Sequence, residues 1–221
     1  MHLGVSLLTW LLAVRLHLAG GAEQPIASAR EQLHGREFWV LADPERPTVP
    51  WRDARDRGDE VVRYRLLLEV GLEDQLPELV TTVGEVLDDP RGWRAAGREF
   101  VRVDAHPQIT IVLARPDTVD RLCKPLRTGG TYSCGRNGRA TLNELRWREG
   151  TATWGDEVEG YRAYMINHEV GHLLGMPHRD CHERGQPAAV MVQQTITLDG
   201  CTTSGWPASF ELDALRRRWA K

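Results

Sequence analysis

Three histidines, a glutamate and a glycine lie within the stretch HEVGHLLGMPH at residues 168–178. His168 and His172 are four residues apart, so on a helix their imidazoles lie on the same side, one turn apart. Gly175 favours a chain reversal directly after that helix, because glycine readily adopts a positive φ. His178 can then return as a third ligand. Imidazole nitrogens at this spacing predict a zinc site.

Glu169 follows the first of these histidines and is rotated from it by about 100° around the helix axis. This direction suits a general base beside the metal better than a further ligand. Three histidine ligands leave a fourth zinc position for water, which is typical of catalytic rather than structural zinc. The simpler interpretation is an amphipathic helix with surface histidines, but the combined spacing of the motif favours a zinc site.

The periodicity of apolar residues predicts the elements that would position these side chains. A helix over residues 156–175 carries the histidines, with Asp156 as its N-cap and Gly175 as its stop. A second helix is expected over residues 73–87, and a long surface loop over residues 43–59, which contain three prolines. Strands are expected at residues 36–41, 60–70, 98–104, 108–115 and 139–147. This order predicts an α/β (α+β) fold with one mixed sheet.

The overall composition is that of a globular domain, with 41% hydrophobic and 27% charged residues. The formal net charge is −3, and no basic cluster of the kind that binds nucleic acid is evident. The three arginines at residues 216–218 suit the C-terminal end of a last helix. We therefore expect a monomeric protein with no nucleic-acid partner.

The N-terminal segment has the pattern of a secretory signal. An apolar run at residues 3–14 is too short to cross a bilayer, and small residues follow it up to Ala22. We interpret residues 1–22 as a signal peptide, residues 23–35 as a linker and residues 36–221 as the catalytic domain. The protein is then secreted. The alternative is an N-terminal anchor, in which case the retained segment would associate with a membrane.

The chain has four cysteines, and none of them belongs to a C-x-x-C pair. An even number in an exported chain indicates disulfides, for which three pairings are open. We favour the local pairs Cys123–Cys134 and Cys181–Cys201, which close loops before and after the histidine stretch. Four free thiols in a reducing compartment are the alternative.

The pattern HExxHxxGxxH, from His168 to His178, resembles the extended zinc motif of the metzincin metallopeptidases. Met191, thirteen residues after His178, stands where that clan has a methionine beneath the metal. Residues 36–206 also resemble an uncharacterised, secreted actinobacterial family of metzincin-like proteins. Gln193 differs from the tyrosine that serves some metzincins as an extra ligand, so that role is expected to be absent.

The resemblance implies a secreted zinc-dependent endopeptidase with one Zn²⁺ per chain. Its twisted mixed sheet and backing helices form an upper lobe to about residue 175, and residues 176–221 form a small, irregular lower lobe. A peptide or protein substrate would lie extended between the lobes, paired with a rim strand at residues 140–147. Met191 would pack beneath the three imidazoles. Glu169 would act as general base toward a zinc-activated water molecule.

Two other functions remain open at this point. The chain can be a zinc-binding scaffold or binding protein without catalytic activity, or a zinc hydrolase of a non-peptide amide. For either hydrolase, a side chain that stabilises the negative charge of the reaction would be needed beside the metal. Tyr161, Tyr164 and Gln193 are the candidates for this role.

Overall fold

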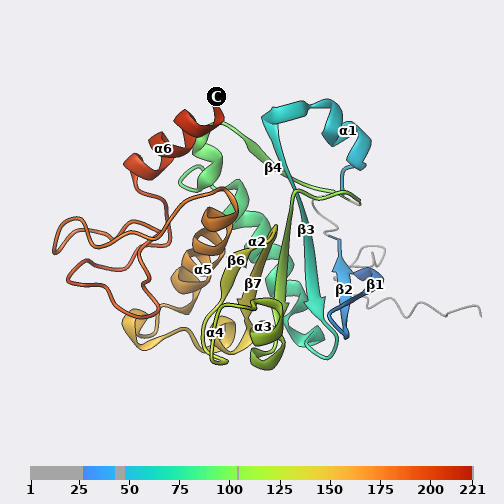
Figure 1. The fold of residues 1–221 in the computed structure, drawn as a ribbon, viewed down its shortest axis with the longest axis horizontal. Coiled ribbons are helices and arrows are strands. Elements are labelled where there is room, and N and C mark those ends of the chain that lie inside the picture. Colours follow the sequence, from blue (N-terminus) through green and yellow to red (C-terminus); the bar gives the residue numbers. More distant parts are fainter. Residues whose placement is uncertain (1–26, 43–47, 104, 221) are drawn as a thin grey trace, which may run out of the picture.

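The computed structural model describes residues 27–42, 48–103 and 105–220 of the 221-residue chain. The predicted signal peptide or anchor lies outside these residues. Within them, seven strands form one mixed sheet with helices on both of its faces (Figure 1). The predicted α/β (α+β) fold with a mixed sheet is therefore confirmed.

The sheet has the strand order β1-β2-β3-β5-β7-β6, and β4 pairs with β3 outside this path. Neighbours β3, β5 and β7 are parallel, as are β3 and β4, whereas β1, β2 and β6 run antiparallel to their neighbours. The bounds are β1 Ala27–Leu33, β2 Arg36–Leu41, β3 Val61–Glu69, β4 Glu99–Arg102, β5 Ile109–Ala114, β6 Cys134–Arg136 and β7 Arg139–Asn143.

The central strands are buried on both faces, which explains their continuous apolar runs. In β3, Leu66 and Leu68 contribute to the main core, whereas Leu67 faces a second cluster on the opposite side of the sheet. All three side chains are fully buried. Strand β5 alternates in the same way. The parallel centre of the sheet is thus a rigid platform with helices above and below it.

Helices α2 and α5 cover the main-core face, and α3 contributes to the cluster on the other face. Figure 1 shows α5, in orange, beside β6 and β7, with which it packs. The helix bounds are α1 Trp51–Asp56, α2 Leu76–Asp88, α3 Pro116–Leu122, α4 Glu144–Glu149, α5 Val158–Leu173 and α6 Ser209–Trp219; short 3-10 helices are Gly58–Glu60, Glu73–Gln75, Trp93–Ala96 and Ala152–Trp154. None of the described helices is long and apolar enough to span a membrane.

Two N-terminal predictions are wrong. The segment interpreted as a linker, residues 23–35, contains strand β1, which pairs with β2 across a turn at His34 and Gly35. Both turn residues have positive φ, 49° and 75°, as two-residue hairpin turns require. The predicted long loop at residues 43–59 contains helix α1, whose Ala54 is buried against the sheet.

The predicted strand at residues 139–147 ends at Asn143. The side chain of this asparagine accepts a hydrogen bond from the backbone N–H of Leu145 at 3.0 Å and so caps α4. Strand β7 is also not the rim of the sheet, because β6 covers its outer side. The histidine helix begins at Val158 rather than near Asp156, and no side chain caps its first turn.

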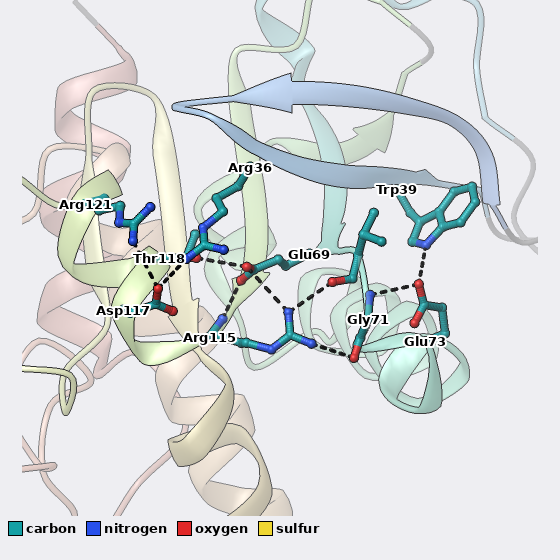
Figure 2. A network of polar contacts seen from close by, with 10 residues as sticks. Arg36, Trp39, Glu69, Gly71, Glu73, Arg115, Asp117, Thr118 and Arg121 are labelled. Carbon is teal, nitrogen blue, oxygen red and sulfur yellow. Dashed lines mark hydrogen bonds and ion pairs between the residues drawn. The ribbon is translucent and has the colours of Figure 1, made fainter. Parts of the chain in front are cut away.

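A polar network joins the carboxyl ends of β3 and β5 to α3 (Figure 2). Its centre is Glu69, which is only 3% exposed. Glu69 accepts hydrogen bonds from the backbone N–H of Arg115 at 2.8 Å and from the hydroxyl of Thr118 at 2.9 Å. Asp117, one residue before Thr118, pairs with Arg36 of β2. The network holds α3 against the sheet. None of its residues belongs to the histidine motif.

Both predicted disulfides are confirmed. Cys123 is bonded to Cys134 and Cys181 to Cys201, with sequence separations of 11 and 20 residues. All four cysteines are therefore paired. Paired cysteines are typical of proteins in an oxidising, extracellular compartment.

The segment after α5 is irregular, as the resemblance implied for the residues that follow Gly175. Residues 176–208 form loops, drawn in orange to red in Figure 1, that lie on the side of α5 away from β3. Isolated bridges join Arg179 to Val192 and Pro187 to Thr202. Helix α6 follows and ends with the three arginines predicted to lie at a helix terminus.

Candidate metal centre

The three histidines of the motif converge on one point. His168 and His172 lie one turn apart on α5, and His178 returns from the loop that follows it. Their metal-ligating nitrogens lie within 4.8 Å of one another. The Nε2 atoms of His172 and His178 are 3.0 Å apart. The spacing of the motif thus produces the predicted cluster.

The return of His178 depends on the way in which α5 ends. The N–H of Met176 donates to the carbonyl of Gly171 at 2.9 Å, and the N–H of Gly175 donates to that of His172 at 3.0 Å. These two bonds form a Schellman motif, in which Gly175 adopts the left-handed conformation with φ of 84°. The prediction that Gly175 ends the helix is confirmed.

Backbone carbonyls orient the two histidines of α5. The Nδ1 atom of His168 lies 2.8 Å from the carbonyl oxygen of Val190, and that of His172 lies 3.1 Å from the carbonyl oxygen of Met176. A carbonyl oxygen can only accept, so each Nδ1 carries the proton and each Nε2 carries a free lone pair. Second-shell bonds of this kind fix the tautomer that binds a metal ion.

This donor set fits a zinc ion. Nitrogen ligands about 2.0–2.1 Å from a tetrahedral zinc are separated by about 3.3 Å, which the observed cluster approaches. Burial also lowers the pKa of His168 to about 3 and lowers the pKa values of His172 and His178. The imidazoles are therefore neutral near pH 7, as metal ligands must be. His168, His172 and His178 could hold one Zn²⁺.

Glu169 lies beside the cluster and lines the same cleft. It is 7% exposed, and burial raises the pKa of its carboxyl to about 8. Within the described residues, no hydrogen-bond donor contacts its carboxylate. A carboxyl group with a pKa near neutrality and without a fixed partner can exchange a proton with a molecule in the cleft.

Met191 packs directly against the histidine helix. It is fully buried, and a Cβ atom built on Gly171 would lie 2.5 Å from its sulfur. Its carbonyl oxygen accepts a hydrogen bond from the N–H of Arg179 at 2.9 Å, so the chain after His178 runs beside the turn at residues 189–192, called the methionine turn below. Met191 thus packs against Gly171, one residue before His172; its place beneath the three imidazoles, which the resemblance implies, stays a prediction.

The histidines line a cleft of about 350 Å³. One wall comes from β6 and the loop before it, and the other from residues 193–196 after the methionine turn. Edge strand β6 contacts α5 closely, because a Cβ atom on Gly135 would lie 2.2 Å from the carbonyl oxygen of Glu169. The lining residues are Leu126, Arg127, Thr128, Tyr132, Ser133, Cys134, Gly135, Tyr164, Met165, His168, Glu169, His172, His178, Gln193, Thr195 and Ile196.

The three side chains considered for stabilising the negative charge of the reaction differ in whether they line the cleft. Tyr164 and Gln193 line the cleft, whereas Tyr161 does not. The hydroxyl of Tyr161 is bonded to that of Thr195 at 3.0 Å, and the hydroxyl of Tyr164 donates to the carbonyl of Val192 at 3.1 Å. Tyr161 is therefore a packing residue, and its assignment as a candidate is wrong.

Sequence reasoning missed two residues that build the site. Gly135 lies in a three-residue strand without periodicity, so nothing distinguishes it in the sequence. Glu211 lies in the first turn of α6 and reaches the methionine turn, where its carboxylate accepts from the N–H of Met191 at 3.0 Å. Its carboxylate also accepts from the N–H of Ala208, three residues earlier, at 2.8 Å. A glutamate three residues after a helix start is the signal that could have identified it.

A search of curated proteins found no similar sequence. Residues 42–206 match the model of a family described as "Protein of unknown function (DUF3152)". The match covers well over half of the chain and includes the histidine motif, Met191 and both disulfides. The chain therefore belongs to the DUF3152 family.

Proposed function

We propose that this protein is a secreted zinc-dependent endopeptidase of the metzincin type. The observation that carries the proposal is the convergence of three imidazoles, two of them oriented by backbone carbonyls, with a buried glutamate in one cleft. A purely structural zinc site has no use for Glu169, whereas a hydrolase needs a base beside its metal. The two disulfides support secretion, because they are typical of extracellular proteins.

In the proposed reaction, the zinc ion and the side chains of the protein have separate roles. A zinc ion held by His168, His172 and His178 would lower the pKa of a water molecule and polarise the scissile carbonyl. Glu169 accepts the proton of the attacking water on its carboxylate and then donates it to the nitrogen of the leaving amine. Burial raises the pKa of Glu169 in the zinc-free chain, and the positive charge of a bound zinc would lower it again, which favours the carboxylate that accepts the proton.

An extended peptide is the substrate class that the cleft favours. Among the strands that the structure describes, β6 pairs with β7 alone, so its other edge can accept a peptide as an additional strand. Three of the four exposed large hydrophobic residues in the described part of the chain also line this cleft, namely Leu126, Tyr132 and Ile196. Such residues at a cleft suit apolar substrate side chains.

The test is cleavage of a diverse peptide library by the zinc-loaded full chain, with products identified by mass spectrometry. We expect cleavage by the wild type and by Glu159→Gln, an exposed glutamate of the same helix. Glu169→Gln should bind zinc but lose activity by at least about 10²-fold. Zinc-loaded wild type that cleaves no peptide would contradict the proposal and would favour a zinc-binding scaffold or a hydrolase of another amide.

A further inference from the structure

A fully buried carboxylate lies behind the metal centre. Glu211 of α6 is 0% exposed, and its side chain accepts three hydrogen bonds from backbone amides. The donors are the N–H groups of Val190 at 3.0 Å, Met191 at 3.0 Å and Ala208 at 2.8 Å. Only the bond to Ala208 is needed to cap the helix. The other two connect α6 to the methionine turn.

One peptide unit connects this carboxylate to a histidine of the cluster. The N–H of Met191 donates to Glu211, and the carbonyl oxygen of the same unit belongs to Val190. That oxygen accepts the Nδ1 proton of His168 at 2.8 Å. The two groups are conjugated across the planar amide, so a negative charge on the N–H side makes the carbonyl a stronger acceptor.

We propose that Glu211 is a positioning residue that orients and polarises His168 as a metal ligand through the peptide unit between Val190 and Met191. The inference rests on the metal site of the proposed function. A stronger acceptor at Nδ1 fixes the imidazole ring and raises the basicity of its Nε2 atom, which strengthens the bond to the metal. Glu211 thus acts on the metal without lying in the cleft.

The other histidine of α5 has no such connection. The Nδ1 atom of His172 also faces a carbonyl oxygen, that of Met176. The next residue is Pro177, so this peptide unit has no N–H that could be polarised. Glu211 can therefore polarise His168 but not His172, whose turn α6 contacts through Arg218, a donor to the carbonyl oxygen of Gly175 at 3.2 Å.

The test measures zinc affinity of the folded full chain by competition with a chromophoric chelator. In Glu211→Gln, one carboxylate oxygen becomes an amide donor, so at least one of the three amides loses its acceptor. We expect the zinc dissociation constant to rise about 10–100-fold, the effect typical of second-shell changes. The visible spectrum of the cobalt(II)-loaded variant should change as well, which a loss of stability alone would not cause.

Glu69→Gln is the matched control, because Glu69 is also a buried carboxylate that accepts a backbone N–H, but it does not line the cleft; Figure 2 shows its partners. Its unfolding temperature should fall, but its zinc dissociation constant should stay within twofold of the wild type. If Glu211→Gln does not fold, Glu211→Asp, which keeps the charge on a shorter side chain, should show a weaker form of the same loss.

Two outcomes would overturn the inference: a zinc affinity of the Glu211 variant within twofold of the wild type, or equal losses in the Glu211 and Glu69 variants. Either result leaves the proposed function standing if the wild type binds zinc and cleaves peptides. Conversely, a wild type that binds zinc but cleaves nothing contradicts the proposed function and leaves the role of Glu211 intact.

Discussion

Gly135 contacts the backbone of Glu169 so closely that a Cβ atom on the glycine would lie 2.2 Å from the glutamate's carbonyl oxygen. The same atom would lie 2.8 Å from the Cβ atom of His172. At Gly135, edge strand β6 therefore contacts the backbone of the histidine helix directly. The distance from the rim of the cleft to the metal ligands depends on this glycine.

Gly135→Ala should push β6 away from α5. Overpacking of this kind costs about 1–3 kcal/mol in the free energy of unfolding, measured by urea denaturation, and should also weaken zinc binding through His172. Gly185→Ala is the control, since a Cβ atom there meets nothing within 4 Å, although its φ is 82°. This substitution should lower the free energy of unfolding by about 1 kcal/mol, because alanine disfavours a positive φ, and should leave the zinc affinity unchanged. If Gly135→Ala had the same stability and zinc affinity as the wild type, the close contact would be refuted.

The stability of the zinc-free chain should fall as the pH rises from 7.5 to 8.5, where the histidines have lost their protons in the folded and the unfolded chain. Burial raises the pKa of Glu169 from 4.5 to about 8, so in this window the unfolded chain binds fewer protons at this carboxyl than the folded chain. Stability then decreases with pH, by at most about 1.4 kcal/mol per unit for one group. Urea unfolding of chelator-treated protein at several pH values measures this slope.

Glu169→Gln removes this titration and should flatten the slope between pH 7.5 and 8.5. Burial lowers the pKa of His168 from 6.5 to about 3 and lowers those of His172 and His178, so their contribution to stability rises as the unfolded histidines lose their protons and is nearly constant above about pH 7.5. The same slope in both proteins between pH 7.5 and 8.5 would show that Glu169 is not buried as described.

The bridge between Cys181 and Cys201 should support the metal centre more than the other bridge does. It closes a loop that contains Met191 and begins three residues after His178. Replacing both cysteines by serine should lower the free energy of unfolding by about 3 kcal/mol and weaken zinc binding. Replacing Cys123 and Cys134 should cost a similar amount of stability without changing zinc affinity. Equal zinc affinities in the two double variants would contradict this difference.

Ile196 should contribute to substrate binding rather than to stability. It is 52% exposed and lines the cleft. Ile196→Ser should change the free energy of unfolding by less than about 0.5 kcal/mol. It should raise KM for peptides with an apolar residue near the scissile bond, with little change in kcat. Phe210→Ser, at an exposed aromatic residue outside the cleft, should leave KM unchanged; an equal effect of both substitutions would exclude this role.

The sequence predicted the parts of the site that depend on local spacing. His168 and His172 are neighbours on any helix, and Gly175 favours the turn that follows. Only the position of His178 beside them depends on the rest of the fold. The buried strands were also predictable, because β3 and β5 are apolar on both faces. The local disulfide pairs followed from their short separations.

The parts that were missed depend on contacts between distant segments or on competing local bonds. Asn143 ends β7 by capping α4, although the residues after it continue a strand-like pattern. Strand β1 is polar and is stabilised by its pairing with β2 rather than by burial. Gly135 and Glu211 acquire their roles only where β6 meets α5 and where α6 meets the methionine turn.

The zinc content of the purified full chain tests most directly the central claim that His168, His172 and His178 together bind one zinc ion. Elemental analysis should find one zinc per chain in the wild type and in Glu169→Gln, and close to none when His172 and His178 are both replaced by alanine. Removal of the zinc should lower the unfolding temperature. A wild type without bound zinc, whose unfolding temperature is unchanged by chelator or by added zinc, would contradict the claim.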